Sequence, residues 1–525
     1  MEHNPALPDE RHTHLRHLRS KRTVLLATAL VTLFALAIYT RTMAPTITWQ
    51  HRGADSGDLV TAAVNLGVPH PTGYPLYTML AHLFTRLPGP EPAWQVTLFS
   101  AIAAALAVGA VFWACHRLVQ NREGTAHLAL LAAWTAAGLY GFGDLLWSQA
   151  TIAEVYSLNA LLAAALLAAA LYSPLRIRPY VLALVLGLGL AHHVTIVFFL
   201  PALWPYLPAI RKWLTPRRLL RLALCLLPGL VTYAYIPLRA RANPIPNWGH
   251  ADNLSSFTWL VSGAAYRYYV AVLSRSYLLQ RLSAWASLWT RDLGVLGLAL
   301  AILGLWRWLE TDRRFGLFGL TYVLLLSSYN MIYMTADSYL YLIPAAMVVA
   351  TWVARGAVML LDGQSPSETG QGRRWIAFAA ILILAGLPLY SLAGRYRSMD
   401  LSADREAYSF AQNVLDAAAA NAIVISSGDR QAFSLWYVHS ALGHRPDVIV
   451  VERRLLAFVW YRDDLAVRYP ELASVAVAHD AQQAIASLIE IGSQARPVQL
   501  ASRDDTVLGL ARWDYSAPLY TLVGP

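Results

Sequence analysis

Cysteine is nearly absent from this sequence. Only two cysteines occur among 525 residues, and both, Cys115 and Cys225, lie inside apolar stretches. So small a number argues against a disulfide framework and against a metal site built from thiolates. We therefore expect both cysteines to be buried structural residues.

Charged residues are also scarce. They make up 14% of the chain, whereas a soluble domain has about 25%. The formal net charge is nonetheless +10, which in a soluble protein would suggest nucleic acid as a partner. Here the basic residues sit in short loops between apolar segments, as membrane topology requires, so we expect no nucleic-acid partner. The sequence also lacks an internal repeat and a Gly-rich phosphate-binding motif.

Apolar residues, in contrast, are abundant. They make up 57% of the chain, the mean hydropathy is +0.43, and a membrane-crossing helix needs about 20 of them. The sequence therefore predicts a mostly α-helical polytopic membrane protein with about eleven transmembrane helices. The expected segments are 22–40, 93–115, 127–146, 155–172, 179–191, 193–209, 217–236, 291–309, 313–331, 338–358 and 373–393. The fifth and sixth are short and could form one helix, and residues 74–87 could lie along the membrane surface.

The loops between these segments differ in character from one side to the other. If the basic residues 1–21 are cytoplasmic and 22–40 is an uncleaved anchor, arginine concentrates in the cytoplasmic loops, as the positive-inside rule demands. The opposite loops gather carboxylates, histidines, tyrosines and tryptophans. Eleven crossings place the C-terminus on that outer side, so we expect a functional site at the outer ends of the helices.

The pattern changes near residue 395. The run "NAIVISSGDRQAFSLWYVHSALGHRPDVIVVERR" predicts a strand, a helix and a second strand. Two strands joined by a helix are typical of a small α/β domain. The expected organisation is a cytoplasmic N-terminus at 1–21, a transmembrane catalytic domain at 22–394 and an extracytoplasmic α/β domain at 395–525.

The first outer loop, "ADSGDLVTAAVNLGVPHPTGYPLY", contains the most suggestive residues. Asp55 and Asp58 could cap the N-terminus of a helix, or they could provide a general base on one helical face. The two roles are compatible. His70 and Tyr74 follow in a proline-rich turn, which could hold His70 rigidly in a site or could simply return the chain to the membrane.

Other candidate residues are spread over the later outer loops. An acid such as Glu154 near a helix end is costly unless it is paired or hydrated. His192 and His193 are neighbours, so they do not share a helical face. They could pack a helix junction, or one of them could contact a phosphate. The remaining binding candidates are Tyr156, Asn247, Trp248, Asp337 and Tyr339.

Two arginines run against the charge bias. Arg239 and Arg241 lie on the outer side, where they could extend toward water from the membrane edge. Alternatively, their guanidinium groups could bind a lipid-linked phosphate in a fixed fork.

The loop sequences resemble a known family. "ADSGDLVTAAVNLGVPHPTGYPLY", "WSQATIAEVYSLNA", "LAHHVT", "YIPLRARANPIPNWG" and "GDRQAFSLWYVHSALGHRPDVIVV" occur in order across roughly residues 45–450. They are similar to a bacterial multi-pass membrane family related to eukaryotic protein O-mannosyltransferases, which are GT-C fold glycosyltransferases. The resemblance implies a polyprenyl-phosphate-linked sugar as donor and a catalytic acid at Asp55. The second acid is often Glu in relatives and is Asp58 here.

The resemblance fits the chemistry of the residues. A polyprenyl donor keeps its phosphate at the membrane interface, where arginines could stabilise the leaving group. An acceptor hydroxyl needs a positioned base, for which Asp55 is the first candidate. We expect an inverting glycosyltransferase, with mannose as one candidate sugar, a protein or glycan acceptor and an extracytoplasmic site in the bacterial inner membrane.

Two alternatives stay open at this point. The chain could be a transporter or flippase for a lipid-linked saccharide, although such proteins often show repeats and polar groups near the bilayer midplane. It could also be a scaffold without catalysis. The sequence predicts no cofactor, yet Asp55, Asp58 and His70 are residue types that a divalent metal could use.

Overall fold

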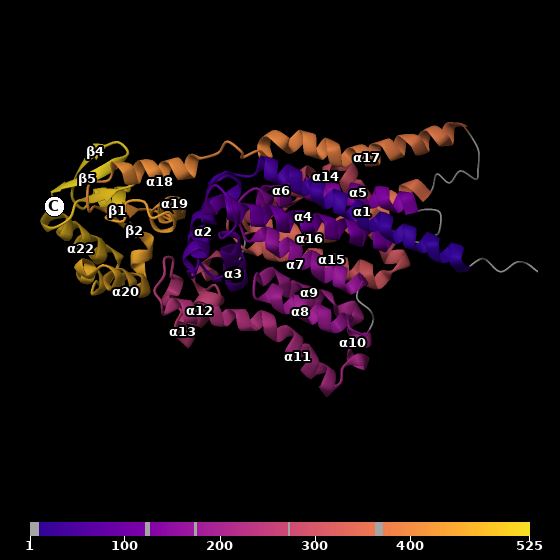
Figure 1. Ribbon diagram of the computed structural model, residues 1–525, viewed down its shortest axis with the longest axis horizontal. Helices are drawn as coiled ribbons and strands as arrows, with labels where there is room; N and C mark the ends of the chain where they lie inside the picture. The colour runs from indigo at the N-terminus through magenta and orange to yellow at the C-terminus, as the bar shows by residue number, and fades with distance from the viewer. Residues whose placement is uncertain (1–9, 121–125, 173–175, 271–273, 363–370, 525) are drawn as a thin grey trace, which may run out of the picture.

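The protein is an elongated molecule with a helical bundle and an α/β domain at one end of it (Figure 1). The computed structural model describes residues 10–120, 126–172, 176–270, 274–362 and 371–524. The N-terminal end of α1 (Glu10–Thr42) lies at the end of the bundle remote from the α/β domain. Helix α17 (Gln371–Met399) runs the length of the bundle and leads into that domain.

Eight helical segments in the described part of the chain are long and apolar enough to cross a membrane, and a bent pair would make nine. The eight are Lys21–Thr42, Pro92–Val119, Val194–Trp213, Pro216–Ala240, Arg275–Thr311, Arg313–Ile332, Ser338–Leu361 and Arg374–Met399. The bent pair is His127–Gly141 with Asp144–Ala150, which meet at 63°. These segments establish a multi-pass membrane protein.

The predicted count of eleven is only partly reproduced. Each of the eleven predicted segments coincides with a helical segment of the structure, but Tyr156–Leu171 and Arg178–Leu190 are shorter than a full membrane span. A helix rises 1.5 Å per residue, so these two cannot cross about 30 Å of hydrocarbon while upright. Most of residues 74–87 form a helix, α3 (Pro75–Phe84), whose expected position along the membrane surface stays a prediction.

The helices of the bundle pack around two central ones. Helices α4 (Pro92–Val119) and α16 (Ile343–Asp362) are mostly buried, and alanines dominate their buried faces. Such small side chains let neighbouring helices approach closely. The other bundle helices are α5 (Ala126–Gly141), α6 (Asp144–Ala150), α7 (Tyr156–Tyr172), α8 (Arg178–Leu190), α9 (Phe199–Ala202), α10 (Leu207–Trp213), α11 (Pro216–Val231), α14 (Arg275–Thr311) and α15 (Arg313–Ile332).

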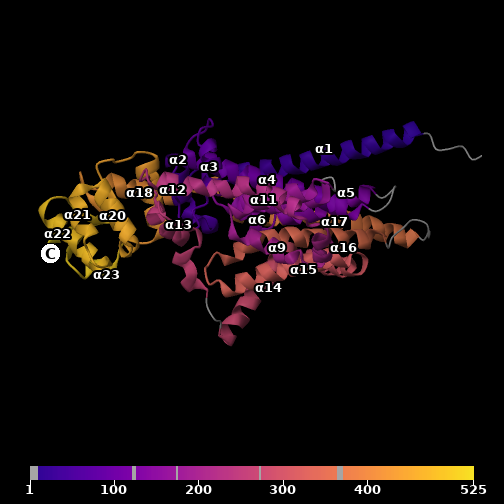
Figure 2. The same ribbon diagram turned by 90° about the horizontal axis from the view of Figure 1, so that it is seen from below.

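Short elements cover the end of the bundle that meets the α/β domain (Figures 1 and 2). They are η1 (Gln50–Asp55), α2 (Ser56–Asn65), α3, α12 (Tyr235–Ala240), η5 (Trp248–His250), α13 (Leu254–Val261) and η6 (Ala264–Tyr269). Most of them come from loops that the sequence assigned to the outer side. The acid-, histidine- and aromatic-rich segments therefore gather at one end of the molecule.

The C-terminal domain is built on a five-stranded sheet with strand order β2-β1-β3-β5-β4. Strand β1 (Ile423–Ser426) pairs in parallel with β2 (Ile449–Glu452) and with β3 (Val498–Leu500). Strand β5 (Leu519–Gly524) runs antiparallel to β3 and to β4 (Arg512–Ser516). The parallel strands are buried apolar runs, as strands covered on both faces usually are. The predicted strand, helix and strand are thus present.

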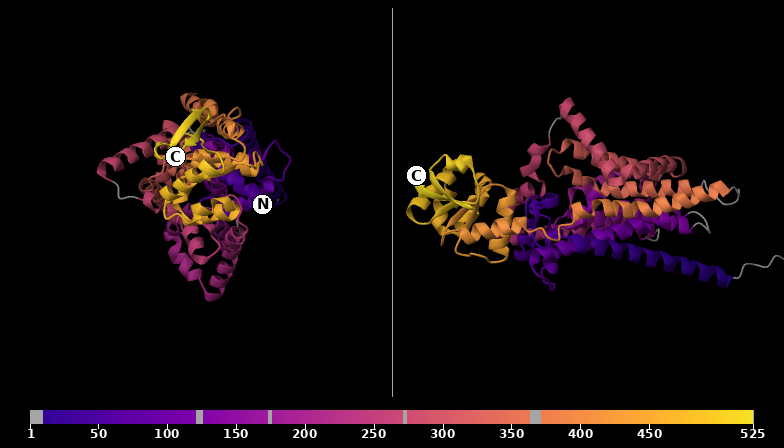
Figure 3. Two further views of the ribbon diagram at one scale, coloured as in Figure 1. Left: turned by 90° about the vertical axis from the view of Figure 1, so that its left-hand side faces the viewer. Right: turned by 90° about the horizontal axis from the view of Figure 1, so that it is seen from above.

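Helices surround this sheet and join it to the bundle. They are α18 (Glu406–Ala417), α19 (Asp429–Trp436), the π-helical turn Tyr437–Ala441, α20 (Val459–Arg468), α21 (Ala473–Ala476), α22 (Ala481–Gln494) and α23 (Asp505–Leu508). Helix α19 begins at the carboxyl end of β1 and packs against α2 of the bundle end. Figure 3 shows this domain capping the bundle end.

Candidate active site

The first outer loop lies directly beneath α19. Asp55 is the residue before α2, and Asp58 lies in its first turn, where a carboxylate is favoured by the helix dipole. Asp55 occupies the N-cap position of α2, as expected, but its side chain makes no capping hydrogen bond. Its carboxylate is instead 38% exposed and points toward His70.

Asp58 is completely buried and fully hydrogen-bonded. One carboxylate oxygen accepts hydrogen bonds from the backbone N–H and the Nδ1–H of His70, at 2.9 and 2.7 Å. The other oxygen accepts a hydrogen bond from Trp248 Nε1 at 3.1 Å. Because both oxygens are occupied and shielded from solvent, Asp58 is suited to fixing His70 in place and poorly suited to taking a substrate proton.

His70 joins the two acids. Its Nδ1 is bound to Asp58, and its Nε2 lies 3.7 Å from the Asp55 carboxylate. Burial by itself lowers the pKa of His70, but the charges of Asp55 and Asp58 and the hydrogen bond to Asp58 outweigh it and raise this pKa to about 9. His70 is therefore an imidazolium near neutral pH, and it holds Asp55 through an ion pair.

The pKa of Asp55 is raised from 3.8 to about 7. Burial is the largest cause, and the carboxylates of Asp429, Asp337 and Asp58 add to it, while the charge of His70 acts in the opposite direction. A carboxylate with a pKa close to neutral can both lose and accept a proton under ordinary conditions. Asp55 thus has the protonation behaviour that a general base requires.

Aromatic rings enclose this group on the bundle side. Tyr74 lies edge-on to His70 with ring centroids 5.3 Å apart and stacks on His193 at 6.5 Å. His193 in turn contacts Tyr156, whose hydroxyl donates a hydrogen bond to Asp337 at 3.1 Å. The structure therefore brings together residues that the sequence placed in four separate loops.

The two adjacent histidines are neutral. Burial lowers the pKa of His192 to about 4 and that of His193 to about 3. His192 Nε2 is bound to the carbonyl of Val155 at 2.9 Å, and His193 Nδ1 to the hydroxyl of Thr195 at 2.9 Å. A neutral, hydrogen-bonded imidazole offers a phosphate little attraction, so the phosphate contact considered for one of them has no support here.

Buried polar atoms without a partner lie beside this group. Glu154 is 3% exposed, and burial raises its pKa well above 4.5. Among the described residues, neither its Oε1 nor His192 Nδ1 has a hydrogen-bond partner. Unpaired buried polar atoms are rare because each costs about 1–3 kcal/mol, so they suggest a place for a polar ligand.

Four of the predicted binding residues lie elsewhere. Arg239 donates hydrogen bonds through Nε to the carbonyl of Leu66 at 2.7 Å and through Nη2 to the carbonyl of Asn65 at 3.2 Å. The structure thus uses Arg239 to satisfy the carbonyls at the C-terminal end of α2, away from the acids at its start. Arg241 is exposed. The other two are Asn247, which binds Asp464 of the C-terminal domain, and Tyr339, which lies beside Arg52 at the edge of the site.

The C-terminal domain contributes residues that the sequence did not single out. Phe433 of α19 stacks on His70 with ring centroids 6.5 Å apart, and Asp429 influences the pKa of Asp55. Asp429 begins the helix that follows β1, and ligands of open α/β sheets commonly bind at such strand ends. That position was a usable signal, but nothing in the sequence tied this strand end to the first outer loop.

Close packing fixes α19 on α2. A Cβ added to Gly57 would lie 2.2 Å from the carbonyl oxygen of Phe433, so only glycine fits here. Trp49 donates from Nε1 to the carbonyl of Arg430 at 2.9 Å, and the Arg430 guanidinium lies 4.6 Å from the Trp49 ring centroid. These contacts hold the C-terminal domain directly over Asp55.

Within the described ranges, no three His, Cys, Asp or Glu side chains are arranged so that they could hold a metal ion. Asp55, Asp58 and His70 are instead bound to one another. The expectation that the protein uses no cofactor stays a prediction.

Known proteins share both the sequence pattern and the fold. A sequence model described as "Protein O-mannosyl-transferase TMEM260 N-terminal domain" matches residues 55–215, and one described as "TMEM260-associated domain 2" matches residues 407–490. Over 462 residues the chain is 28% identical to protein O-mannosyl-transferase TMEM260 of Mus musculus, covering 80% of this chain and 62% of the mouse protein. The chain is thus similar to protein O-mannosyl-transferases in sequence.

A second curated relative and two solved structures extend the comparison. The Dictyostelium discoideum protein O-mannosyl-transferase tmem260 is 22% identical over 501 residues, which are 84% of this chain and 59% of that protein. ArnT from Cupriavidus metallidurans, bound to undecaprenyl phosphate, aligns with a TM-score of 0.56 at 14% identity over 95% of this chain and 97% of ArnT. The apo oligosaccharyltransferase of Archaeoglobus fulgidus aligns with a TM-score of 0.51 at 13% identity over 90% of this chain and 69% of that one.

These comparisons support a GT-C fold and show a similarity to protein O-mannosyl-transferases. The chain spans about three-fifths of the length of the curated relatives that it matches. Both of those relatives are eukaryotic proteins, so the bacterial setting expected from the sequence stays a prediction.

Proposed function

We propose that the protein is a membrane glycosyltransferase that moves a sugar from a polyprenyl-phosphate donor to a hydroxyl group of a protein. Mannose is the proposed sugar because the related proteins are named as O-mannosyl-transferases. The charge bias of the loops supports an extracytoplasmic site, and we propose the bacterial inner membrane as its location.

One observation carries this proposal. Asp55 is a partly exposed carboxylate whose pKa is about 7, and a buried chain of Trp248, Asp58 and His70 holds it. This is the arrangement of an oriented general base. The acceptor oxygen would form a bond to the anomeric carbon while its proton passes to Asp55. The bond from that carbon to the phosphate oxygen would break, and the polyprenyl phosphate would leave with the electron pair.

In an in-line displacement, His70 would act together with the base Asp55 and not on the leaving phosphate. The leaving phosphate must depart from the face of the sugar opposite the incoming oxygen, which inverts the anomeric carbon. Because His70 lies against Asp55, it serves the attacking side of the reaction. The cation for the phosphate must come from another residue, and Arg241 remains a candidate whereas Arg239 is bound to backbone carbonyls.

Two unpaired polar atoms on the bundle side of the site could bind the hydroxyl groups of a sugar. Glu154 Oε1 and His192 Nδ1 are buried and without partners among the described residues. Sugar hydroxyl groups both donate and accept hydrogen bonds, so they could satisfy both atoms. The aromatic rings of Tyr74 and Tyr156 would provide apolar contact for the sugar ring.

The test is sugar transfer from a polyprenyl-phosphate-mannose donor to threonine-containing peptides by the purified full-length protein. We expect Asp55→Asn to lower kcat by about 10²- to 10⁴-fold, the usual contribution of a general base. Asp505→Asn, at a 77% exposed side chain of the C-terminal domain, is the matched control. Full activity of Asp55→Asn would contradict the assignment of the base, and movement of the donor across the membrane without transfer would favour a flippase.

A further inference from the structure

We propose that the acceptor polypeptide binds in the trough between residues 243–248 and the C-terminal domain. This inference rests on the proposed function, because it names the binding place of that reaction's acceptor. The trough combines two neighbouring hollows, which share the wall residues Pro244, Ile245, His439 and Ser440.

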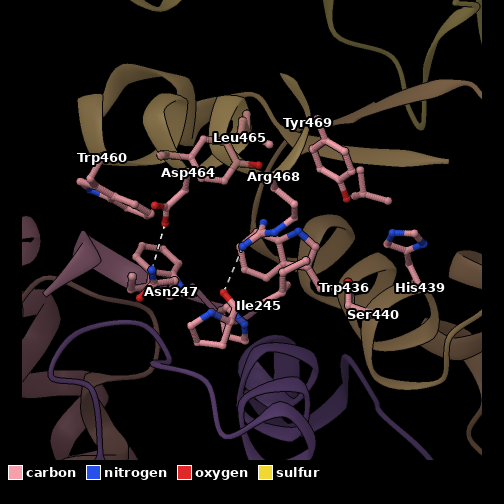
Figure 4. Close-up of a pocket in the computed structure, with 15 residues that line it drawn as sticks. Ile245, Asn247, Trp436, His439, Ser440, Trp460, Asp464, Leu465, Arg468 and Tyr469 are labelled. Carbon is pink, nitrogen blue, oxygen red and sulfur yellow. Dashed lines mark hydrogen bonds between the residues drawn. The ribbon is translucent and has the colours of Figure 1, made fainter. Parts of the chain in front are cut away.

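The first hollow is lined by aromatic rings. Its walls include the rings of Trp248, Trp436, Trp460, Tyr461 and Tyr469. Figure 4 shows side chains of the C-terminal domain facing Ile245 and Asn247 of the bundle across this space. An apolar side chain of an acceptor would fill such a pocket.

Three buried polar atoms in this wall have no partner among the described residues. They are Asn247 Oδ1, Ser440 Oγ and Trp460 Nε1. Asn247 Oδ1 accepts a hydrogen bond, and Trp460 Nε1–H donates one. A peptide unit offers one N–H donor and one C=O acceptor, so its two polar groups match this pair.

The second hollow makes the binding region elongated. It is lined by Asn65, Arg239, Ala242 and Pro446 together with the shared wall. An extended chain can occupy two hollows in sequence, whereas a single sugar ring would fill only one. The trough therefore favours a polypeptide.

Trp248 links the trough to the acids. One part of its ring lines the first hollow, while Nε1 donates to Asp58. Its ring centroid lies 6.4 Å from that of His70, and His70 Nε2 lies 3.7 Å from Asp55. An extended chain advances about 3.3 Å per residue, so the residue anchored in the first hollow would lie a few residues from the modified hydroxyl.

Polar contacts across the trough keep its walls together. Asp464 binds His250 Nδ1 at 2.5 Å and Asn247 Nδ2 at 3.2 Å. Arg468 donates to the carbonyls of Asn243 and Pro244 at 3.1 and 3.2 Å. None of these contacts involves Ser440 or Trp460, so these two residues can be changed without removing them.

The test uses two variants. Trp460→Phe removes the Nε1–H and keeps an aromatic ring. Ser440→Leu places a larger side chain in the shared wall and so narrows the trough. The control is Trp513→Phe, because Trp513 Nε1 in β4 is also buried and unpaired but lies outside the trough. A labelled threonine peptide is titrated onto each full-length protein, and transfer from polyprenyl-phosphate-mannose is measured in parallel. The loss of one hydrogen bond weakens binding roughly two- to tenfold.

We expect Trp460→Phe to raise the Kd and KM of the peptide by that factor, Ser440→Leu to raise both further, and the KM of the donor to stay unchanged. Moving one phenylalanine along an otherwise alanine-based threonine peptide should give the tightest binding at one fixed spacing, a few residues from the threonine. Peptide binding that is unaffected by both trough variants would overturn the inference. If the wild type binds peptide at the trough but transfers no sugar, the proposed function fails while the binding site stands.

Discussion

Replacing His70 with glutamine tests whether the charge of His70 lowers the pKa of Asp55. The imidazolium of His70 lies 3.7 Å from Asp55 and lowers the pKa of that carboxyl against the effect of burial. Glutamine can still donate a hydrogen bond but carries no charge, and the backbone N–H of residue 70 still donates to Asp58. The pKa of Asp55 should therefore rise above its value of about 7.

The size of the change follows from the distance. Two unit charges 3.7 Å apart attract by about 1 kcal/mol at the dielectric constant of water and by about 4.5 kcal/mol at an effective value of 20. Asp55 is 38% exposed, so solvent screening keeps the interaction nearer the lower figure. A rise of about one pKa unit corresponds to 1.36 kcal/mol. Since the base must be ionised to act, the rate at pH 7 should fall about fivefold.

The assay is the pH profile of sugar transfer between about pH 5.5 and 9.5. In the wild type, activity should rise with pH through about 7 as Asp55 ionises. In His70→Gln the same rise should be displaced by about one unit, and the two rates should converge near pH 9. An unshifted profile, or a loss that high pH does not reverse, would refute the electrostatic role of His70. His479→Gln, at an exposed site in the C-terminal domain, should behave like the wild type.

Three further predictions concern the surroundings of this site. Asp429→Asn removes a charge that raises the pKa of Asp55, so the rise of activity with pH should move to lower pH. Arg239→Ala removes two hydrogen bonds to the end of α2. It should reduce the free energy of unfolding, measured by denaturation in detergent, by about 1–3 kcal/mol. The KM of the donor should not change. Gly57→Ala should force α2 and α19 apart and lower both Tm and activity, whereas Gly394→Ala, with open space around it, should leave both near the wild-type values.

The elements that the sequence predicted well are those whose signals are local. Each apolar run of sufficient length became a helix, and the buried strands β1 and β2 were visible as short β-branched runs. Asp55, Asp58 and His70 were found together because they share one loop, and a chain of sixteen residues keeps them within reach of one another.

The structure differs from the expectations mainly where these depended on which distant residues meet. Arg239 was a candidate for binding a phosphate or for extending toward water, because an outer arginine opposes the charge bias; in the structure its guanidinium binds the carbonyls at the end of α2. Every helix end leaves such carbonyls to be paired, but a sequence does not say which side chain reaches them. The short helices Tyr156–Leu171 and Arg178–Leu190 likewise showed that an apolar run need not be a full membrane span.

The sequence by itself predicted that this chain enters the membrane repeatedly, contains an α/β domain and collects its candidate site residues in the loops of one side, because hydrophobic length, periodicity and charge bias act locally. Only the tertiary structure decided which of those residues meet. It placed Trp248 on Asp58, set Asp429 and Phe433 over the first outer loop, and bound Arg239 to the end of α2 that lies away from the acids. Such encounters depend on how helices and domains pack, and a pKa depends on every charge and buried surface that packing brings near.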